Sequence, residues 1–164
     1  MQDEVDALAE QWRAGGMSPH VIPQLMLGKR ILRISGVLEQ AMRVELAELG
    51  LTYAEFDVLA TLRRGGALKP SELSRSLLLT SGGTSNVLQR LTAAGYVERE
   101  ADTGDARSRW VRLTGSGTAI TDRAMVASTR LHEQLLADVP AESVQRAADA
   151  LREIVLAIGT RRFR

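Results

Sequence analysis

The segment TSGGTSNVLQRL at residues 80–91 places two glycines and several short polar residues where a helix is expected. Successive side chains on a helix turn by about 100°, which predicts one small, polar face over residues 81–94: Gly82, Ser85, Asn86 and Gln89. The opposite face is apolar and consists of Val87, Leu88, Leu91 and Ala94, with Thr84 at its edge. Short hydroxyl and amide side chains can hydrogen-bond to base edges and phosphates in the major groove of DNA. A plain solvated helix face is the alternative interpretation.

The first turn of this helix is the unusual part, because glycine costs up to about 1 kcal/mol relative to alanine inside a helix. Gly82 and Gly83 would let the helix N-terminus, with its free N–H groups, approach a phosphate closely. Ser81 (or Thr80) is the expected N-cap.

A cluster of arginines follows a tight acidic turn, ADTGD, further along the chain. Arg107, Arg109 and Arg112 lie on one expected strand, and arginine is the residue that enters a narrow minor groove. The alternative is a solubilising edge strand. Taken with the polar helix face, the cluster favours DNA binding. The predicted DNA-contacting residues are Arg75, Ser81, Gly82, Ser85, Asn86, Gln89, Arg107 and Arg109.

The hydrophobic periodicity and the capping, glycine and proline residues at segment ends place these residues on specific helices and strands. Thr52 and Glu55 form a capping box that opens a helix ending near the Gly65-Gly66 pair, and Pro70 opens a short helix. YVERE and RSRWVRLT flank the acidic turn as a β-hairpin. Longer helices are expected on either side, over residues 3–14, 19–48, 116–137 and 141–158. The sequence therefore predicts a mainly α fold with a small β-hairpin wing, a winged helix-turn-helix at 52–114 with flanking helices.

Charge and composition restrict the function. The net charge is +1, but the nine Lys and Arg against five Asp and Glu between Arg63 and Arg112 leave that segment at +4 and the remainder at −3. A basic middle suits a polyanionic partner. The chain has no cysteine, and its two histidines, His20 and His132, are far apart, so neither a metal site nor a cofactor is expected.

The motifs that the sequence lacks argue against other classes of protein. The sequence has no G-x-G-x-x-G unit, no nucleophile near a histidine and no paired carboxylates, so we expect no enzyme. The acidic N-terminus lacks the features of a signal peptide, and no apolar run approaches about 18 residues. We therefore expect a cytoplasmic protein with no membrane partner. A winged helix used only for protein contacts stays an alternative.

Four segments carry a resemblance to a known family: LTYAEFDVLATLRRGG, KPSELSRSLLLTSGG, SNVLQRLTAAGYVERE and D-TGDARS-RWVRLT-GSG. They resemble the MarR family of winged-helix transcription regulators. The resemblance implies a single domain over 1–164 that forms a homodimer through helices in 19–48 and 116–162 and binds a pseudopalindromic operator with half-sites about one helical turn apart. It assigns Arg107 to the minor groove. Ala106 stands where many relatives have a second arginine, which leaves the wing one charge weaker.

A finer resemblance concerns a small-molecule effector. The urate-responsive branch of the family has an extra N-terminal helix with a tryptophan. It also has an aspartate and an arginine seven residues apart on the helix of the FDVLATLRR motif, and an arginine on the recognition helix. This chain has Trp12, Asp57, Arg64 and Arg90 at the matching places. Asp57 and Arg64 are about 700° apart on a helix and so share a face. The resemblance implies a repressor released by urate or a similar anion.

Each of these four residues has an alternative role. Trp12 could stack on a planar ring or only attach its short helix to the body. Asp57 and Arg64 could bind the ligand or form an ordinary surface pair. Arg90 could couple the ligand to the DNA-reading helix or contact a phosphate. Phenolic compounds, aromatic carboxylates and small polycarboxylates are the alternative ligands.

Overall fold

The computed structural model describes residues 2–77, 81–100 and 110–159. It consists of helices and one two-stranded antiparallel sheet, in which Val97 pairs with Leu113 and Glu100 pairs with Trp110. This confirms the predicted fold class. The elements are α1 (Glu4–Ala14), α2 (Ile22–Ala47), α3 (Tyr53–Gly65), α4 (Pro70–Ser76), α5 (Ser81–Ala93), β1 (Val97–Glu100), β2 (Trp110–Leu113), α6 (Gly115–Leu135) and α7 (Ala141–Ile158).

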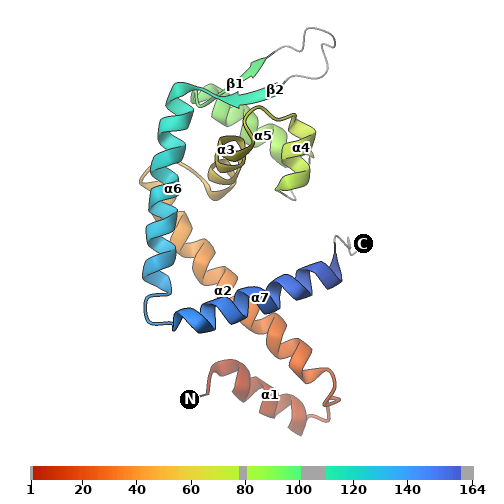
Figure 1. Cartoon of the computed structure of the whole chain (residues 1–164). Helices are drawn as coiled ribbons and strands as arrows, with labels where there is room; N and C mark the ends of the chain where they lie inside the picture. Colours follow the sequence, from red (N-terminus) through yellow and green to blue (C-terminus); the bar gives the residue numbers. More distant parts are fainter. Residues whose placement is uncertain (1, 78–80, 101–109, 160–164) are drawn as a thin grey trace.

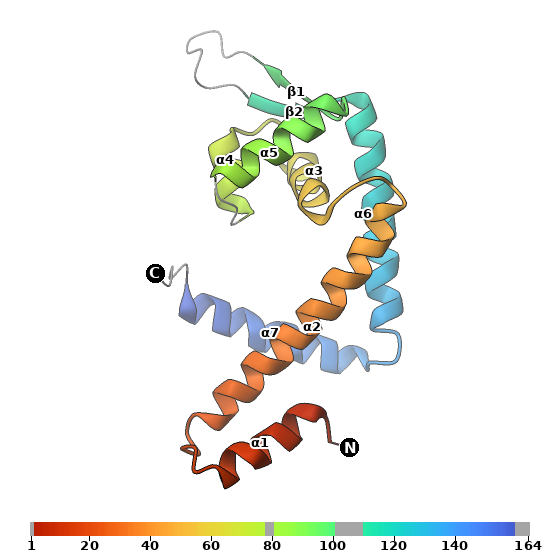
Figure 2. The same ribbon diagram turned by 180° about the vertical axis from the view of Figure 1, so that it is seen from behind.

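The elements divide into two regions. Helices α3, α4 and α5 lie together beneath the β1–β2 hairpin, while α2 and α6 run side by side away from them (Figure 1). Helix α1 packs against the far end of α2 (Figure 2), and Leu151 of α7 borders the same cavity as Ile31 of α2. We call α3 to β2 the winged-helix module, and α1, α2, α6 and α7 the helical frame.

The winged-helix module has a fully buried apolar centre. Side chains from every one of its elements meet there: Leu59, Leu62, Leu73, Leu88, Leu91, Val97 and Val111. The predicted capping box begins α3, since the Thr52 backbone N–H donates to the Glu55 carboxylate at 2.7 Å. Leu68 adds a bridge to Val111 of β2, which attaches the α3–α4 connection to the hairpin. This core continues into the adjoining parts of α2 and α6 through Leu46 and Ala124.

Glycine is required where the hairpin passes into the frame. Gly117 is buried in the first turn of α6, and a Cβ atom there would lie 1.8 Å from the backbone oxygen of Tyr96. Thr114 caps this turn by accepting a hydrogen bond from the Gly117 N–H at 3.0 Å, and it donates to the Gly95 carbonyl at 2.7 Å. The GSG segment therefore allows α6 to start directly against β1.

The helical frame has much less buried surface. Val5, Ala9 and Ile22 are buried where α1 meets α2, and Arg30 pairs with Asp3 and Asp6 at 2.8 Å each. Apart from Ile22 at its start, the buried residues of α2 lie near its C-terminal end, Met42 and Leu46. Others are exposed, including Leu27, Ile31, Leu32 and Ile34. No helix in the described ranges has the length and apolarity needed to cross a membrane.

The observed boundaries differ slightly from the predicted ones. Helix α5 ends at Ala93, and Ala94 is exposed in the turn that leads to Gly95, which adopts a positive φ of 72°. Helix α6 begins at Gly115, because Thr114 caps its N-terminus. It ends at Leu135. Only residues 110–113 of the second predicted strand segment are described as a strand, and α2 begins at Ile22.

Candidate nucleic-acid interface and ligand pocket

Helix α5 presents the predicted polar face to solvent. Gly82, Ser85, Asn86 and Gln89 are all exposed, whereas Leu88 and Leu91 are buried in the module. Among the described residues, a Cβ atom added to Gly82 would meet nothing within 4 Å, so the surface beside this glycine is open. The side chain of Ser81 lies outside the described residues, so its predicted cap is not tested.

A buried hydroxyl pair fixes the start of α5 against α4. Thr84 is 1% exposed, and the Ser74 hydroxyl donates to Thr84 Oγ1 at 2.8 Å. Sequence analysis placed Thr84 at the edge of the apolar face but missed this bond. The only signal for it was a threonine among leucines on the buried face, which needs a hydrogen-bonding partner when buried.

Further basic residues lie at the base of the hairpin and on α4. Arg99 of β1 shares a shallow hollow of about 640 Å³ with Ser85, Gln89, Thr92 and Ala93. Lys69 stands over the ring of Trp110 at 5.1 Å, a cation–π contact that joins the start of α4 to β2. Arg75 of α4 is exposed. Arg107 and Arg109 lie outside the described residues. Arg99 is a candidate that sequence analysis did not select.

Two of the four predicted ligand residues line one pocket. Asp57 and Arg64 border a hollow of about 650 Å³ between α3 and α4, which we call the charged pocket; its other lining residues are Thr61, Gly65, Leu68, Ser76 and Leu77. Burial raises the pKa of Asp57 above its ordinary value, while the Arg64 guanidinium partly opposes this shift. Arg64 Nη2 donates to Thr61 Oγ1 at 3.4 Å. A half-buried carboxyl and a guanidinium thus face the same space.

The other two predicted ligand residues do not line the charged pocket. Arg90 forms an ion pair with Glu55, with 3.1 Å between Arg90 Nε and Glu55 Oε1. Trp12 is half-buried on α1, and both views place α1 at the opposite end of α2 from α3 (Figures 1 and 2). Within one chain, the structure therefore brings together only Asp57 and Arg64.

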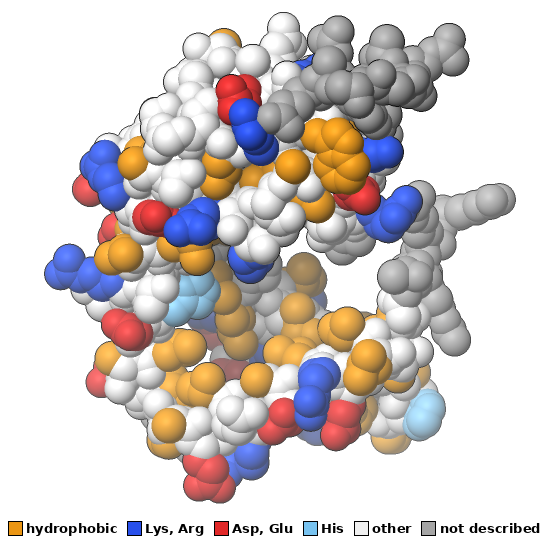
Figure 3. Space-filling model, turned by 45° about the horizontal axis from the view of Figure 1, so that its top comes forward, with side chains coloured by type: hydrophobic (Ala, Val, Ile, Leu, Met, Phe, Trp, Pro, Cys, Tyr) orange, Lys and Arg blue, Asp and Glu red, His pale blue; other side chains and the backbone are white. Residues whose placement is uncertain are grey.

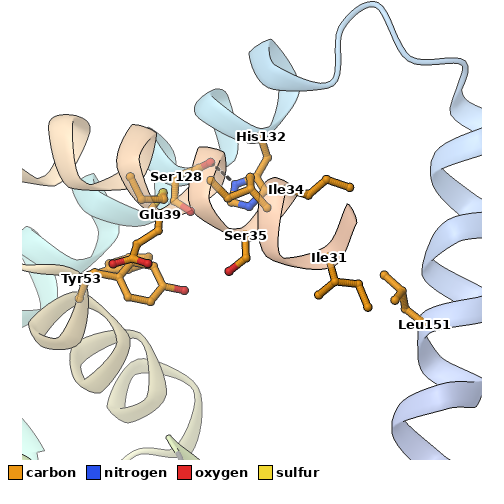
Figure 4. A pocket seen from close by; sticks show the side chains of 11 residues that line it. Ile31, Ile34, Ser35, Glu39, Tyr53, Ser128, His132 and Leu151 are labelled. Carbon is orange, nitrogen blue, oxygen red and sulfur yellow. Dashed lines mark hydrogen bonds between the residues drawn. The ribbon is translucent and has the colours of Figure 1, made fainter. Parts of the chain in front are cut away.

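A second pocket lies between α2, α3, α6 and α7. This apolar cavity of about 520 Å³ is bordered by Ile31 and Ile34 of α2, with Leu151 facing them from α7 (Figure 4). Hydrophobic side chains gather around the hollow below the module on the face drawn in Figure 3. Sequence analysis missed this cavity because its walls come from four elements. The surplus of apolar residues on α2 was the available signal.

The polar groups of the apolar cavity come from three helices: Ser35 and Glu39 of α2, Tyr53 of α3, and Ser128 and His132 of α6. The Nδ1 atom of His132 lies 2.7 Å from the Ser128 carbonyl oxygen. Burial raises the pKa of Tyr53, and the Asp57 and Glu39 carboxylates add to the shift. The cavity therefore offers a neutral phenol and an imidazole beside apolar walls.

Comparisons with known proteins match this architecture. The MarR family model matches residues 49–108. The transcriptional regulator PecS of Dickeya dadantii is 34% identical over 125 residues, which cover 74% of this chain and 75% of PecS. The chain belongs to the MarR family. The transcriptional repressor Rv2887 of Mycobacterium tuberculosis is also 34% identical, over 76% of this chain and 77% of that protein.

A solved structure of this family includes DNA. The structure of an E. coli MarR mutant complexed with operator DNA aligns with a TM-score of 0.75 and 27% identity, over 84% of this chain and 99% of that one. Together with the relatives, which are transcription regulators rather than enzymes, it shows that this MarR-family chain is a DNA-binding transcription regulator.

Proposed function

We propose that the protein is a homodimeric repressor that binds a pseudopalindromic operator and is released by a small anionic aromatic ligand, with urate or a similar purine as the first candidate. The polar face of α5 would enter the major groove and the wing the minor groove. The open space beside Gly82 is the observation that carries the assignment of α5, since it leaves room for a close DNA backbone. Arg99 is a further candidate phosphate contact.

Exposed apolar side chains of the helical frame support the homodimer. Helix α7 buries none of its residues, and Val155 and Leu156 are 65% and 75% exposed. On α2, Leu32 is 70% and Ile34 is 60% exposed. Apolar surface of this extent is typical of an interface with another chain. A second copy would cover these faces and set the spacing of two α5 helices for two half-sites.

The charged pocket supports the choice of ligand. Arg64 can pair with an anionic oxygen, and the Asp57 carboxyl can accept N–H groups of a purine. The resemblance adds Trp12 and Arg90 to the same ligand. Both lie outside the pocket in the single chain, so their contact with the ligand requires a second copy or a movement of their helices.

The apolar cavity favours a second candidate ligand, a phenolic compound or an aromatic carboxylate. Apolar walls with a few converging polar groups are typical of small-molecule sites. Tyr53 and His132 supply hydrogen-bonding groups that suit a phenol or a carboxylate.

Fluorescence anisotropy on DNA from immediately upstream of the protein's own gene tests these proposals. We would titrate urate, salicylate and citrate at fixed salt into the complexes of wild type, Arg64→Gln and Tyr53→Phe. Release by urate that is lost in Arg64→Gln but kept in Tyr53→Phe supports the charged pocket. Release by salicylate that depends on Tyr53 moves the effector to the apolar cavity.

A matched control variant tests whether the loss of one positive charge from this end of α3 is by itself enough to abolish the response to urate. Arg63→Gln removes the same charge one residue away, at an exposed pair with Asp122 of α6. It should respond to urate as wild type does. DNA affinity that does not fall as salt rises would contradict operator binding and favour a protein-interaction module, since phosphate contacts release counterions.

A further inference from the structure

The single charged side chain of α5 pairs with a buried carboxylate of α3, although the arginine side chain itself is 65% exposed. Arg90 is the only charged residue in the sequence of Ser81–Ala93, and it lies in the last turn of the helix. Its guanidinium pairs with Glu55 of α3, with 3.1 Å between Nε and Oε1. The Glu55 side chain is 6% exposed, and Glu55 is the one acidic residue that is buried in the described part of the chain.

Glu55 is a fixed partner for this arginine. Its Oε2 atom accepts hydrogen bonds from the Thr52 backbone N–H at 2.7 Å and from the Thr52 hydroxyl at 2.8 Å. The capping box of α3 therefore immobilises the carboxylate and leaves Oε1 directed to Arg90. Because the carboxylate is already held in place, forming the ion pair costs little conformational entropy beyond that of the arginine side chain. The charge-assisted contact is correspondingly directional.

The pair is located where it can set the orientation of the reading helix. The Ser74–Thr84 hydrogen bond fixes α5 in its first turn, and the Arg90–Glu55 pair fixes it in its last turn. Leu88 and Leu91 hold the helix against the module between these points, but apolar packing is not directional. Two directional contacts at the two ends define how far α5 is rotated and hence where Ser85, Asn86 and Gln89 point.

We infer that Arg90 is a positioning residue for DNA recognition, which acts through Glu55 rather than by a direct contact with phosphate. The inference rests on DNA binding by α5. Sequence analysis considered a phosphate contact and a ligand contact for Arg90, and a positioning role through Glu55 was not among them.

A double-mutant cycle on the operator fragment tests this role. We would measure the Kd of wild type, Arg90→Gln, Glu55→Gln and the double variant by anisotropy at several salt concentrations. Arg90→Gln should weaken binding about fivefold without changing the salt slope. In the Glu55→Gln background the same change should cost less than about twofold, since the pair is already lost.

A direct phosphate contact gives a different result. The slope of log Kd against log salt would then be shallower in Arg90→Gln by about 0.9 per protomer, or about 1.8 for a dimer on both half-sites, and the loss of affinity would be equal in both backgrounds. Either observation overturns the inference. Unchanged DNA affinity with lost release by urate overturns it as well, in favour of a ligand contact. Wild type that does not bind the fragment at all would count against the choice of operator and not against Arg90.

Hydrogen exchange gives an independent measurement that does not need the Glu55 variant to fold. The backbone amides in the second half of α5 should exchange faster in free Arg90→Gln than in free wild type, because the helix end is released. Arg63→Gln, which removes an exposed pair between α3 and α6, is the matched control and should leave α5 exchange unchanged. Equal protection of α5 in all three proteins would contradict a positioning role.

Discussion

The winged-helix module and the helical frame bury their apolar side chains to very different extents. In the module, Leu59 and Leu73 of α3 and α4 are 0% exposed, and Leu88 of α5 is 1% exposed. In the frame, Leu156 of α7 is 75% exposed and α7 has no buried residue. The module thus buries its apolar side chains within one chain, whereas the frame leaves apolar faces exposed that a second copy would cover in the proposed homodimer.

Introducing charged residues into the apolar face of α7 should cause the largest effect on oligomeric state and operator affinity, because this face belongs to the proposed dimer interface. Leu151 and Val155 lie one turn apart, and replacing both by Glu places two charges on the apolar face. We expect light scattering to report a monomer and operator affinity to fall at least about a hundredfold, since two linked half-site contacts become one.

The control for this prediction changes the charge by the same amount on the polar face of α7. Arg146→Glu also lowers the net charge by two, at an exposed residue paired with Glu142. It should remain dimeric. A dimer that persists in the double glutamate variant would show that the exposed face of α7 is not the interface.

Truncation of the module core is expected to give the next largest effect. Leu91 is 1% exposed, so Leu91→Ala should lower the free energy of unfolding by about 3 kcal/mol. Val126→Ala on the exposed side of α6, where the side chain is 69% exposed, should change it by less than about 0.5 kcal/mol. Urea unfolding at equal protein concentrations measures both. Similar losses in the two variants would contradict the contrast between module and frame.

Removal of the buried hydroxyl bond should have a smaller effect. Ser74→Ala deletes the donor to Thr84 Oγ1, and we expect a loss of about 1 kcal/mol in the free energy of unfolding. Because the bond fixes the first turn of α5, operator affinity should fall as well. Unfolding and anisotropy measured on the same preparation would show whether the two losses occur together; an unchanged operator affinity would separate this bond from the reading helix.

Replacing Asp57, the half-buried carboxyl of the charged pocket, should have the smallest effect on the free energy of unfolding. Burial raises the pKa of Asp57 above its ordinary value of 3.8, so the folded chain binds this proton more tightly than the unfolded chain does. Stability contributed by the protonated form is therefore present below about pH 4 and is lost as pH rises through the raised pKa. Asp57→Asn should be more stable than wild type at neutral pH, with no such advantage in acid. Urea unfolding of both proteins across this range tests the sign, and a gap that does not vary with pH would contradict it.

Local signals in the sequence predict most of the module. The capping box of Thr52 and Glu55, Pro70 at the start of α4 and the acidic turn before RSRWVRLT act within a few residues of themselves, so each element was predicted with small errors at its ends. The exposure of the α5 polar face follows from helical geometry alone.

Contacts between distant residues could not be predicted in the same way. The bond from Ser74 to Thr84 and the pair between Glu55 and Arg90 depend on how two helices are rotated, which periodicity does not determine. The apolar cavity requires four helices to be placed together. Sequence analysis grouped Trp12 with Asp57 through a resemblance, whereas the single chain places them in separate regions.

The contact between Lys69 and Trp110 gives the protein a built-in optical probe. The chain has two tryptophans, and they lie at opposite ends of the molecule, Trp12 on α1 and Trp110 at the base of the wing. Indole emission depends on nearby charge, so displacement of the Lys69 ammonium from the Trp110 ring shifts the spectrum of that residue. A variant with Trp12 replaced by Phe reports on the wing, and one with Trp110 replaced by Phe reports on α1, without any attached dye. Changes at the wing and changes around α1 can thus be observed separately in one unlabelled chain.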